Sequence, residues 1–217
     1  MAIFFKLVFI TLTIAFFGGV YGLINLKRLR TSFKWLTVYL LFSVLAQVLG
    51  YFVGQGLGSN QIYFIVVSPF YYLLVYLIFA NFTKNKRILA INNILFAIGA
   101  LFLFVFLAID IHAGNTSDKS VSICNFLYSL ASFIFFFDML KAPIKKSPLK
   151  TPEFYFLFGF LFYHSAVIFF RAADALFVNE FNKLSLNYLH VAMLIIYYCT
   201  LSASLVVENK NNRLNGS

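Results

Sequence analysis

The residues most able to do chemistry lie inside a segment that is otherwise apolar. Residues 154–176 read FYFLFGFLFYHSAVIFFRAADAL and include His164, Arg171 and Asp174. An ionisable side chain at the centre of a membrane helix costs about 2.5–3.5 kcal/mol on insertion scales, so a retained one usually faces a partner or a cavity. Positions 164 and 171 are two helical turns apart and position 174 is close to one turn further. We therefore expect one polar stripe along this helix.

This stripe suits the binding of a small anion. Arg171 offers a planar guanidinium that can hold a carboxylate or a phosphate with two hydrogen bonds, and His164 would form the floor of the pocket. His190 is expected at about the height of Arg171, because the last helix runs in the opposite direction. Gln47 is expected to point into the bundle, because glycines follow it along the second span. Alternatively, Arg171 extends to the lipid headgroups and pairs with Asp174, with no ligand.

A metal site that includes His164 and His190 is the alternative to an anion site. His112 and Asp110 follow the fourth span, and with His164 and His190 they would supply the imidazole and carboxylate ligands that zinc prefers. Seven-helix zinc hydrolases resemble this chain in having a histidine within a late span and another in the next. Their closing paired-histidine motif is absent, since residues 187–190 contain one histidine. We expect no cofactor, and zinc is the alternative.

Composition indicates which solvent surrounds the chain. Of the 217 residues, 62% are hydrophobic and 11% are charged, whereas soluble domains average about 45–50% and about 25%. The mean hydropathy is +0.88, and the apolar runs approach the roughly 20 residues that cross a bilayer as a helix. The sequence predicts an all-α polytopic membrane protein with one domain, residues 1–217. Its seven expected transmembrane helices are 3–24, 35–56, 62–82, 88–109, 121–140, 154–176 and 186–207.

The basic residues give the expected orientation. The chain has 17 Lys and Arg against 7 Asp and Glu, a formal net charge of +10. Most lie in clusters at every second connection, which is typical of cytoplasmic loops. This places the N-terminus outside and the C-terminus in the cytoplasm, with membrane lipid and not nucleic acid as the partner of the positive charge. The clusters are Lys27, Arg28, Arg30 and Lys34; Lys84, Lys86 and Arg87; Lys141, Lys145, Lys146 and Lys150; Lys210 and Arg213.

The position of the last helix excludes one familiar seven-helix function. Retinal proteins bind their chromophore as a Schiff base to a lysine in the last helix. Residues 186–207 contain no lysine, so the chain is not a rhodopsin.

Four short features carry a resemblance to a group of membrane proteins. They are Trp35 opening the second span, Asn60 to Tyr63 before the third, Asn125 opening the fifth, and Tyr188 to His190 opening the seventh. In these features the chain resembles uncharacterised bacterial seven-helix membrane proteins with aromatic-rich helices, some relatives of which look like sensory input modules. The resemblance implies a bacterial cytoplasmic (inner) membrane protein in a sensory or accessory role.

Together these features favour a non-enzymatic protein that binds a small anionic ligand, or a partner membrane protein, through a polar pocket opening outward. A metal-dependent membrane hydrolase and a small-solute transporter are the alternatives. The stripe of His164, Arg171 and Asp174, with His190 and Gln47, is the expected binding site.

The orientation can be tested with single cysteines introduced into two connections. A cysteine replacing Asn115 is expected to react with a membrane-impermeant maleimide in intact cells. One replacing Ser147 is expected to react only after permeabilisation, because it lies in a basic and therefore cytoplasmic loop. The reverse labelling pattern would contradict the orientation and the outward face of the pocket.

Overall fold

The structure is a computed structural model of the chain. It describes the backbone of residues 2–57, 61–113, 119–141, 147–176 and 180–215, and the side chains of residues 6–56, 63, 66–109, 122–141, 147–173 and 186–214. The described part of the chain is all-helical, with 94% of residues in helices. Its seven α-helices are α1 (Ala2–Ile24), α2 (Thr31–Leu57), α3 (Gln61–Ala80), α4 (Lys86–Ala113), α5 (Lys119–Lys141), α6 (Pro152–Leu176) and α7 (Glu180–Asn215).

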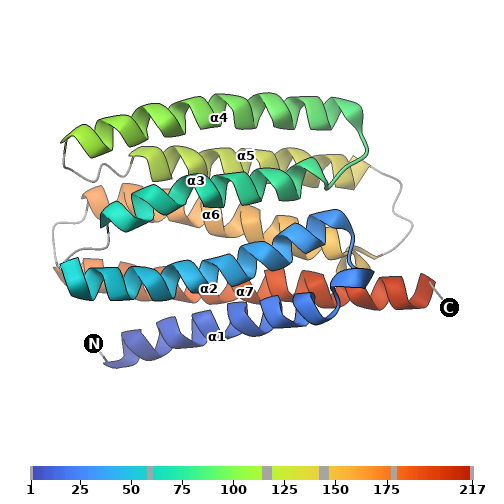
Figure 1. The fold of residues 1–217 in the computed structure, drawn as a ribbon, viewed down its shortest axis with the longest axis horizontal. Helices are drawn as coiled ribbons and strands as arrows, with labels where there is room; N and C mark the ends of the chain where they lie inside the picture. Colours follow the sequence, from blue (N-terminus) through green and yellow to red (C-terminus); the bar gives the residue numbers. More distant parts are fainter. Residues whose placement is uncertain (1, 58–60, 114–118, 142–146, 177–179, 216–217) are drawn as a thin grey trace.

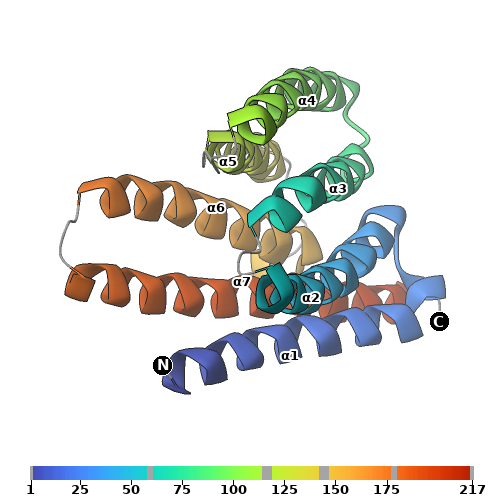
Figure 2. The same cartoon turned by 60° about the vertical axis from the view of Figure 1, so that its left-hand side comes forward.

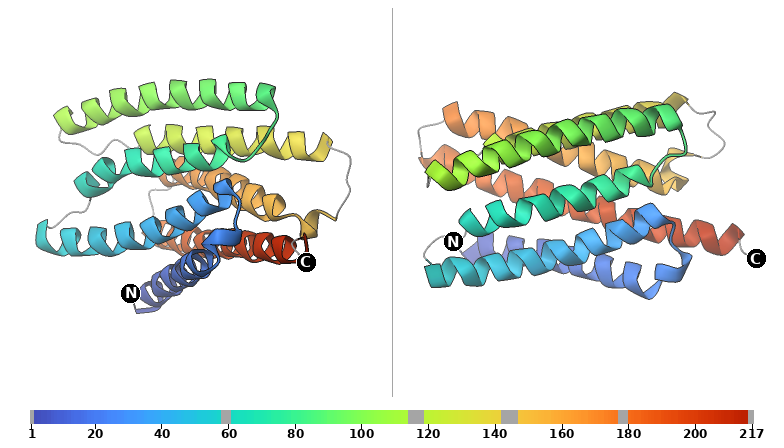
Figure 3. Two further views of the ribbon diagram at one scale, coloured as in Figure 1. Left: turned by 45° about the vertical axis from the view of Figure 1, so that its right-hand side comes forward. Right: turned by 45° about the horizontal axis from the view of Figure 1, so that its top comes forward.

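The helices form a bundle in which neighbours in sequence are antiparallel neighbours in space (Figure 1). Each helix packs against the next one along the chain, and α1 also packs against α7, which closes the arrangement into a ring. The helices α2 and α7, and also α3 and α5, touch across this ring. The two termini lie at opposite ends of the long axis (Figure 1), and Figures 2 and 3 show the bundle from other sides.

Six of the helices are long and apolar enough to cross a membrane, which indicates a multi-pass membrane protein. The remaining helix, α3, contains a shorter apolar stretch, Val66–Ala80, within the part of the chain whose side chains are described. All seven apolar segments expected from the sequence are helical, so the all-α prediction is confirmed. Three of the basic clusters, at residues 27–34, 84–87 and 210–213, lie at the end of the bundle that holds the C-terminus. We call this the basic end.

The last helix is longer than the sequence predicts. The expected end at residue 207 is wrong, because α7 continues to Asn215. The polar residues beyond 207 are held by hydrogen bonds to other elements: Asn209 Nδ2 donates to the Tyr21 hydroxyl at 2.7 Å, and Asn212 Nδ2 donates to the Arg28 carbonyl at 2.6 Å. Low hydropathy alone therefore did not mark the end of this helix.

The interior is built mainly from aromatic rings. Near the basic end, the fully buried Phe79 of α3 has its ring centroid 5.1 to 5.8 Å from those of Phe135, Phe156 and Phe160. Tilted and edge-on ring pairs at these spacings are the preferred geometries of aromatic packing. A layer of phenylalanine thus fills the bundle between its basic end and its middle, where tyrosine and histidine take over.

Two glycines of α1 permit its close contacts. The spacing of Gly18 and Gly22 predicts a close-packing face, and the structure confirms it. A Cβ atom at Gly18 would lie 2.9 Å from Ser202 Cβ on α7, and one at Gly22 would lie 2.9 Å from Thr37 Cγ2 and 3.0 Å from Thr37 Cβ on α2. These distances are too short for real carbon contacts, so the backbone of α1 approaches both neighbours because these positions have no side chain.

Gly22→Ala is expected to lower the stability of the purified protein in detergent, by about 1–3 kcal/mol, because the new methyl group overpacks the contact with Thr37. Gly56→Ala is the matched control, since a Cβ there meets nothing within 4 Å. The control is expected to be neutral or stabilising by up to about 1 kcal/mol, through the better helix propensity of alanine. Thermal unfolding of the two variants tests this. Equal stability of the two variants would contradict the close approach of α1 and α2.

Candidate functional site

His164 lies in the middle of α6 and in the centre of the bundle. Its side chain is only 4% exposed, and its Nδ1 atom is 2.6 Å from Oδ1 of Asn125 on α5. An amide oxygen only accepts hydrogen bonds, so this contact places the ring proton on Nδ1 and leaves a lone pair on Nε2. Within the described part of the chain, Nε2 has no hydrogen-bond partner. Its ring is surrounded by those of Tyr128, Phe160, Tyr163 and Tyr197.

Tyr163 connects His164 to His190. The Tyr163 ring is edge-on to the His164 ring, with centroids 5.1 Å apart, and its hydroxyl lies 3.4 Å from Nε2 of His190 on α7. It also stacks on Tyr197, with centroids 4.5 Å apart and an interplanar angle of 21°. The two histidines therefore do not touch directly. They form a column in which a tyrosine lies between them.

Arg171 lies two turns beyond His164 along α6. It is partly buried, and it is close enough for its positive charge to act on both Tyr163 and His190. Three of the expected residues, His164, Arg171 and His190, are thus brought into one column that we call the α6–α7 column, together with Tyr163. The side chain of Asp174, which was expected to continue the stripe, lies outside the described residues.

Gln47 is not part of this column. Its side chain is exposed on the surface of α2, so the expectation that it points into the bundle is wrong. The buried face of α2 at this height is formed by Ala46, which is 2% exposed, and by Gly50. Gln47 follows Ala46 by one residue and is therefore turned by about 100° around the helix axis. The small residues pack inward and the glutamine points away from the core.

The zinc alternative gains no support from the described residues. Among their side chains, no group of three His, Cys, Asp or Glu residues is placed to share a metal ion. Tyr163 separates His164 from His190, so these two cannot act as neighbouring ligands in this arrangement. The side chains of the other two proposed ligands, His112 and Asp110, lie outside the described residues.

The column is supported by a tyrosine pair that sequence reasoning missed. The hydroxyls of Tyr39 on α2 and Tyr197 on α7 are 2.9 Å apart, and both side chains are buried. This contact joins α2 to α7 across the ring, next to the stack of Tyr197 on Tyr163. The available signal was position: both tyrosines lie well inside their spans, whereas tyrosine in membrane helices is enriched at the two interfaces.

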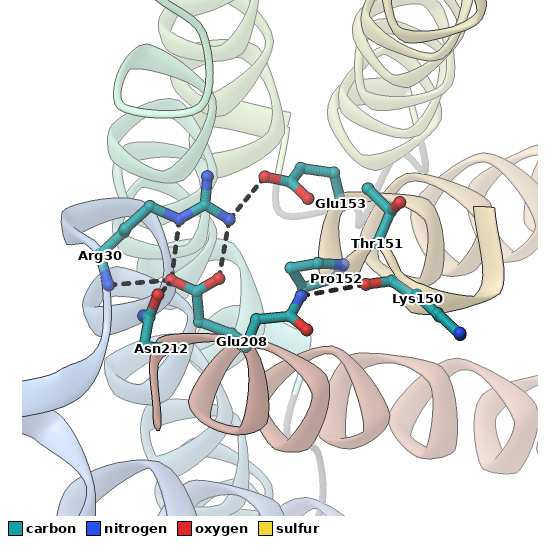
Figure 4. A pocket seen from close by; sticks show the side chains of 8 residues that line it. Arg30, Lys150, Thr151, Pro152, Glu153, Glu208 and Asn212 are labelled. Atoms are coloured by element: carbon teal, nitrogen blue, oxygen red, sulfur yellow. Dashed lines mark hydrogen bonds and ion pairs between the residues drawn. The ribbon is translucent and has the colours of Figure 1, made fainter. Parts of the chain in front are cut away.

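A second polar site lies at the basic end, and sequence reasoning missed it as well (Figure 4). Glu208 of α7 is 1% exposed and receives three hydrogen bonds from Arg30, which precedes α2. They come from the Arg30 backbone N–H at 3.2 Å, from Nε at 2.8 Å and from Nη2 at 2.7 Å. The same Nη2 also pairs with Glu153 at the start of α6. One guanidinium therefore fixes three parts of the bundle to one another.

Burial and the neighbouring carboxylates have opposite effects on the pKa of Arg30 in this ion-pair cluster. Burial alone would lower the pKa of Arg30, but hydrogen bonds and attraction from Glu208 and Glu153 outweigh it and raise this pKa above its usual value. A cavity of about 320 Å³ lies beside the cluster. Asn211 and Asn212 line it and donate to the Lys150 and Arg28 carbonyls. The sequence contains only 7 Asp and Glu, and two of them, Glu153 and Glu208, lie next to basic clusters. This position could have indicated an ion pair.

Comparisons with protein families, with curated proteins and with solved structures found no match. No activity, ligand or residue role is therefore transferred to this chain from a relative. Function resides in sites and not in folds, so the arrangement of the chain's own residues decides what it can bind.

Glu208→Gln is expected to destabilise the protein more than Glu153→Gln. Glu208 accepts from Arg30 and also from Asn212 at 3.0 Å, and its side chain is 2% exposed against 19% for Glu153. Losing charged hydrogen bonds at the buried position should remove about 1.5–3 kcal/mol, whereas the more exposed pair should contribute less than about 1 kcal/mol. Thermal unfolding of both variants in detergent measures the difference. Equal losses would show that Glu208 is not the central acceptor of the cluster.

Proposed function

We propose that this chain is a seven-span protein of the bacterial cytoplasmic membrane that binds a small anionic ligand from the outer side, in a sensory or accessory role. The N-terminus lies outside and the C-terminus in the cytoplasm. The closed ring of seven antiparallel helices, the termini at opposite ends and the gathering of basic residues at the C-terminal end support this topology. The α6–α7 column, which extends from the middle of the bundle away from the basic end, is the binding site.

The main support for this proposal is that the buried Nε2 atom of His164 has no hydrogen-bond partner among the described residues. A buried polar atom without a partner costs about 1–3 kcal/mol and needs a physical reason. His164 is held by Asn125 in the orientation that leaves Nε2 ready to accept a hydrogen bond. Above it, Arg171 supplies a positive charge that acts on His190 and Tyr163. An anion bound near Arg171, with a hydrogen-bond donor directed toward His164, would match both features.

The helices that carry this column also carry the ion-pair cluster. Glu153 precedes His164 on α6 by about 16 Å of helix, and Glu208 follows His190 on α7 by about 27 Å. A ligand that changes the packing of α6 against α7 at one end would therefore act on the contacts of Arg30 at the other. A ligand can shift such a bundle only by binding its conformations with unequal affinity. This arrangement supports a sensory role more directly than a catalytic one.

The proposal can be tested by thermal unfolding of the purified protein with phosphate, succinate and glutamate as probe anions. Binding to the folded state alone stabilises it by about 2.7 kcal/mol at a hundred times the Kd. At least one probe is expected to raise the Tm of the wild type, and Arg171→Gln is expected to abolish that rise. Arg87→Gln, which alters an exposed arginine near the basic end, is the control and should retain it.

Three results would contradict the proposal. The first is the failure of every probe anion to stabilise the wild type, and the second is stabilisation that survives in Arg171→Gln. The third is zinc on the purified protein that is lost in His164→Ala and His190→Ala, which would indicate the hydrolase alternative. Uptake of a probe anion into proteoliposomes that depends on Arg171 would indicate a transporter with the same binding site.

A further inference from the structure

A groove lies between α3 and α4 on the surface of the membrane-spanning bundle. Its volume is about 460 Å³, and its lining is apolar or aromatic except for one amide, Asn93. Phe70 and Leu73 of α3 and Phe104 of α4 are more than half exposed along it, so the groove opens toward the surrounding lipid. The other lining residues are Pro69, Tyr72, Tyr76, Phe96, Ala97, Ala100 and Leu103.

Small residues and one hydrogen bond explain why the groove forms here. Ala97 and Ala100 leave the wall of α4 shallow, and Pro69 interrupts the backbone hydrogen bonding of α3. At the floor, the Tyr72 hydroxyl donates to the Phe96 carbonyl at 2.6 Å and ties the two helices together. The Tyr72 and Phe96 rings also contact each other, with centroids 5.2 Å apart. The groove is therefore a built feature of the helix pair.

The residues of α4 along the groove form a graded stripe. Lys86, Asn93, Ala97, Ala100 and Phe104 fall within about 40° of one direction around the helix, at 100° per residue. From the basic end, this stripe presents a cation, an exposed amide, two small residues and an aromatic ring. A phospholipid presents a complementary order, with an anionic phosphate, then ester groups, then an acyl chain.

The length of the groove agrees with one leaflet of a bilayer. From Asn93 to Phe104 the helix rises about 16 Å, and half of the hydrocarbon core is about 15 Å thick. Lys86 lies about 10 Å further toward the basic end, at the depth of the headgroups.

The charge at the mouth of the groove favours an anionic headgroup. Lys84, Lys86 and Arg87 are all exposed there. Asp138 of α5 accepts a hydrogen bond from Asn85 at 3.2 Å and offsets part of this charge, which leaves the mouth positive. A basic residue near the membrane surface attracts anionic lipid by about a fivefold factor in binding.

We propose that the α3–α4 groove binds one anionic phospholipid from the leaflet at the basic end of the bundle. An acyl chain fills the groove, the Asn93 amide faces the ester groups, and the phosphate lies against Lys86 and Arg87. This proposal does not rest on the ligand proposed for the α6–α7 column, and it requires only that the bundle spans a membrane.

The test is native mass spectrometry of the full chain in detergent, with phosphatidylglycerol or phosphatidylcholine of identical acyl chains added. One phosphatidylglycerol is expected to remain bound under conditions that remove phosphatidylcholine. Ala97→Trp, which fills the groove, should weaken this binding about tenfold or more. Val105→Trp is the matched control, because Val105 is exposed on the same helix outside the groove lining, and it should bind as the wild type does.

Charge variants test the headgroup part of the site. Lys86→Gln with Arg87→Gln should weaken phosphatidylglycerol binding about twenty-fivefold and leave phosphatidylcholine binding unchanged. Lys27→Gln with Lys34→Gln changes two exposed lysines at the same end of the bundle and should have little effect. Equal loss in both pairs would show general attraction to the basic end and would overturn the specific site.

A second measurement covers the case in which Ala97→Trp does not fold. A bimane fluorophore on Ala97→Cys should be quenched more strongly by phosphatidylglycerol with brominated acyl chains than by brominated phosphatidylcholine. Equal quenching by the two lipids, or undiminished phosphatidylglycerol binding in a folded Ala97→Trp variant, would overturn the proposal.

Discussion

A bilayer core offers no hydrogen-bond partners, so polar groups within this bundle must find them in one another. The described interior follows that constraint at several levels. Buried hydroxyls within the helices donate to the backbone carbonyl four residues earlier in the same helix, as Thr37 does to Phe33 and Ser132 does to Tyr128. Between helices, the same requirement is met by the hydrogen bond between Tyr39 of α2 and Tyr197 of α7. It is also met by the two hydrogen bonds that the Arg30 guanidinium donates to the Glu208 carboxylate. Among the described residues, the Nε2 atom of His164 is one of several exceptions, with both amide atoms of Asn92, Ser202 Oγ and Asn209 Oδ1. It differs from these in lying on the same helix as Arg171 and next to Tyr163.

The two polar sites are separated by a packed aromatic layer. Phe160 contacts His164 on one side, with ring centroids 5.1 Å apart, and Phe156 on the other, at 4.5 Å. Phe79 contacts both phenylalanines from α3. Side chains packed in this way do not deform continuously, so a ligand that displaced α6 would be expected to move it as a rigid element. This supports coupling between the α6–α7 column and the ion-pair cluster through movement of helices, in preference to passage of a solute between them.

Features that depend on periodicity and composition could be predicted from the sequence. Features that depend on how a helix is rotated about its axis, or on contacts with residues distant in the sequence, could not. Seven helical segments, the close approach at Gly18 and Gly22, and the order of His164 and Arg171 along one helix all follow from spacing. Gln47 is exposed although glycines follow it, because the inward face of α2 at this height runs through Ala46 and Gly50. Glu208 was overlooked because local hydropathy falls after residue 207. Its burial depends on Arg30, which is distant in the sequence, and no local pattern contains that contact.

The lipid groove and the α6–α7 column are linked by contacts between neighbouring rings. Tyr71 of α3, adjacent to the groove residue Tyr72, packs edge-on against Tyr39 with ring centroids 5.8 Å apart. Tyr39 in turn shares a hydrogen bond with Tyr197, which stacks on Tyr163. Such a route carries coupling only if an element along it has two arrangements that both sites favour unequally. In α3, Pro69 removes one backbone hydrogen bond beside the groove, and two arrangements of the helix at this residue are what such coupling would require. A lipid that fills the groove would therefore stabilise one arrangement of α3, and through the tyrosines one arrangement of the column.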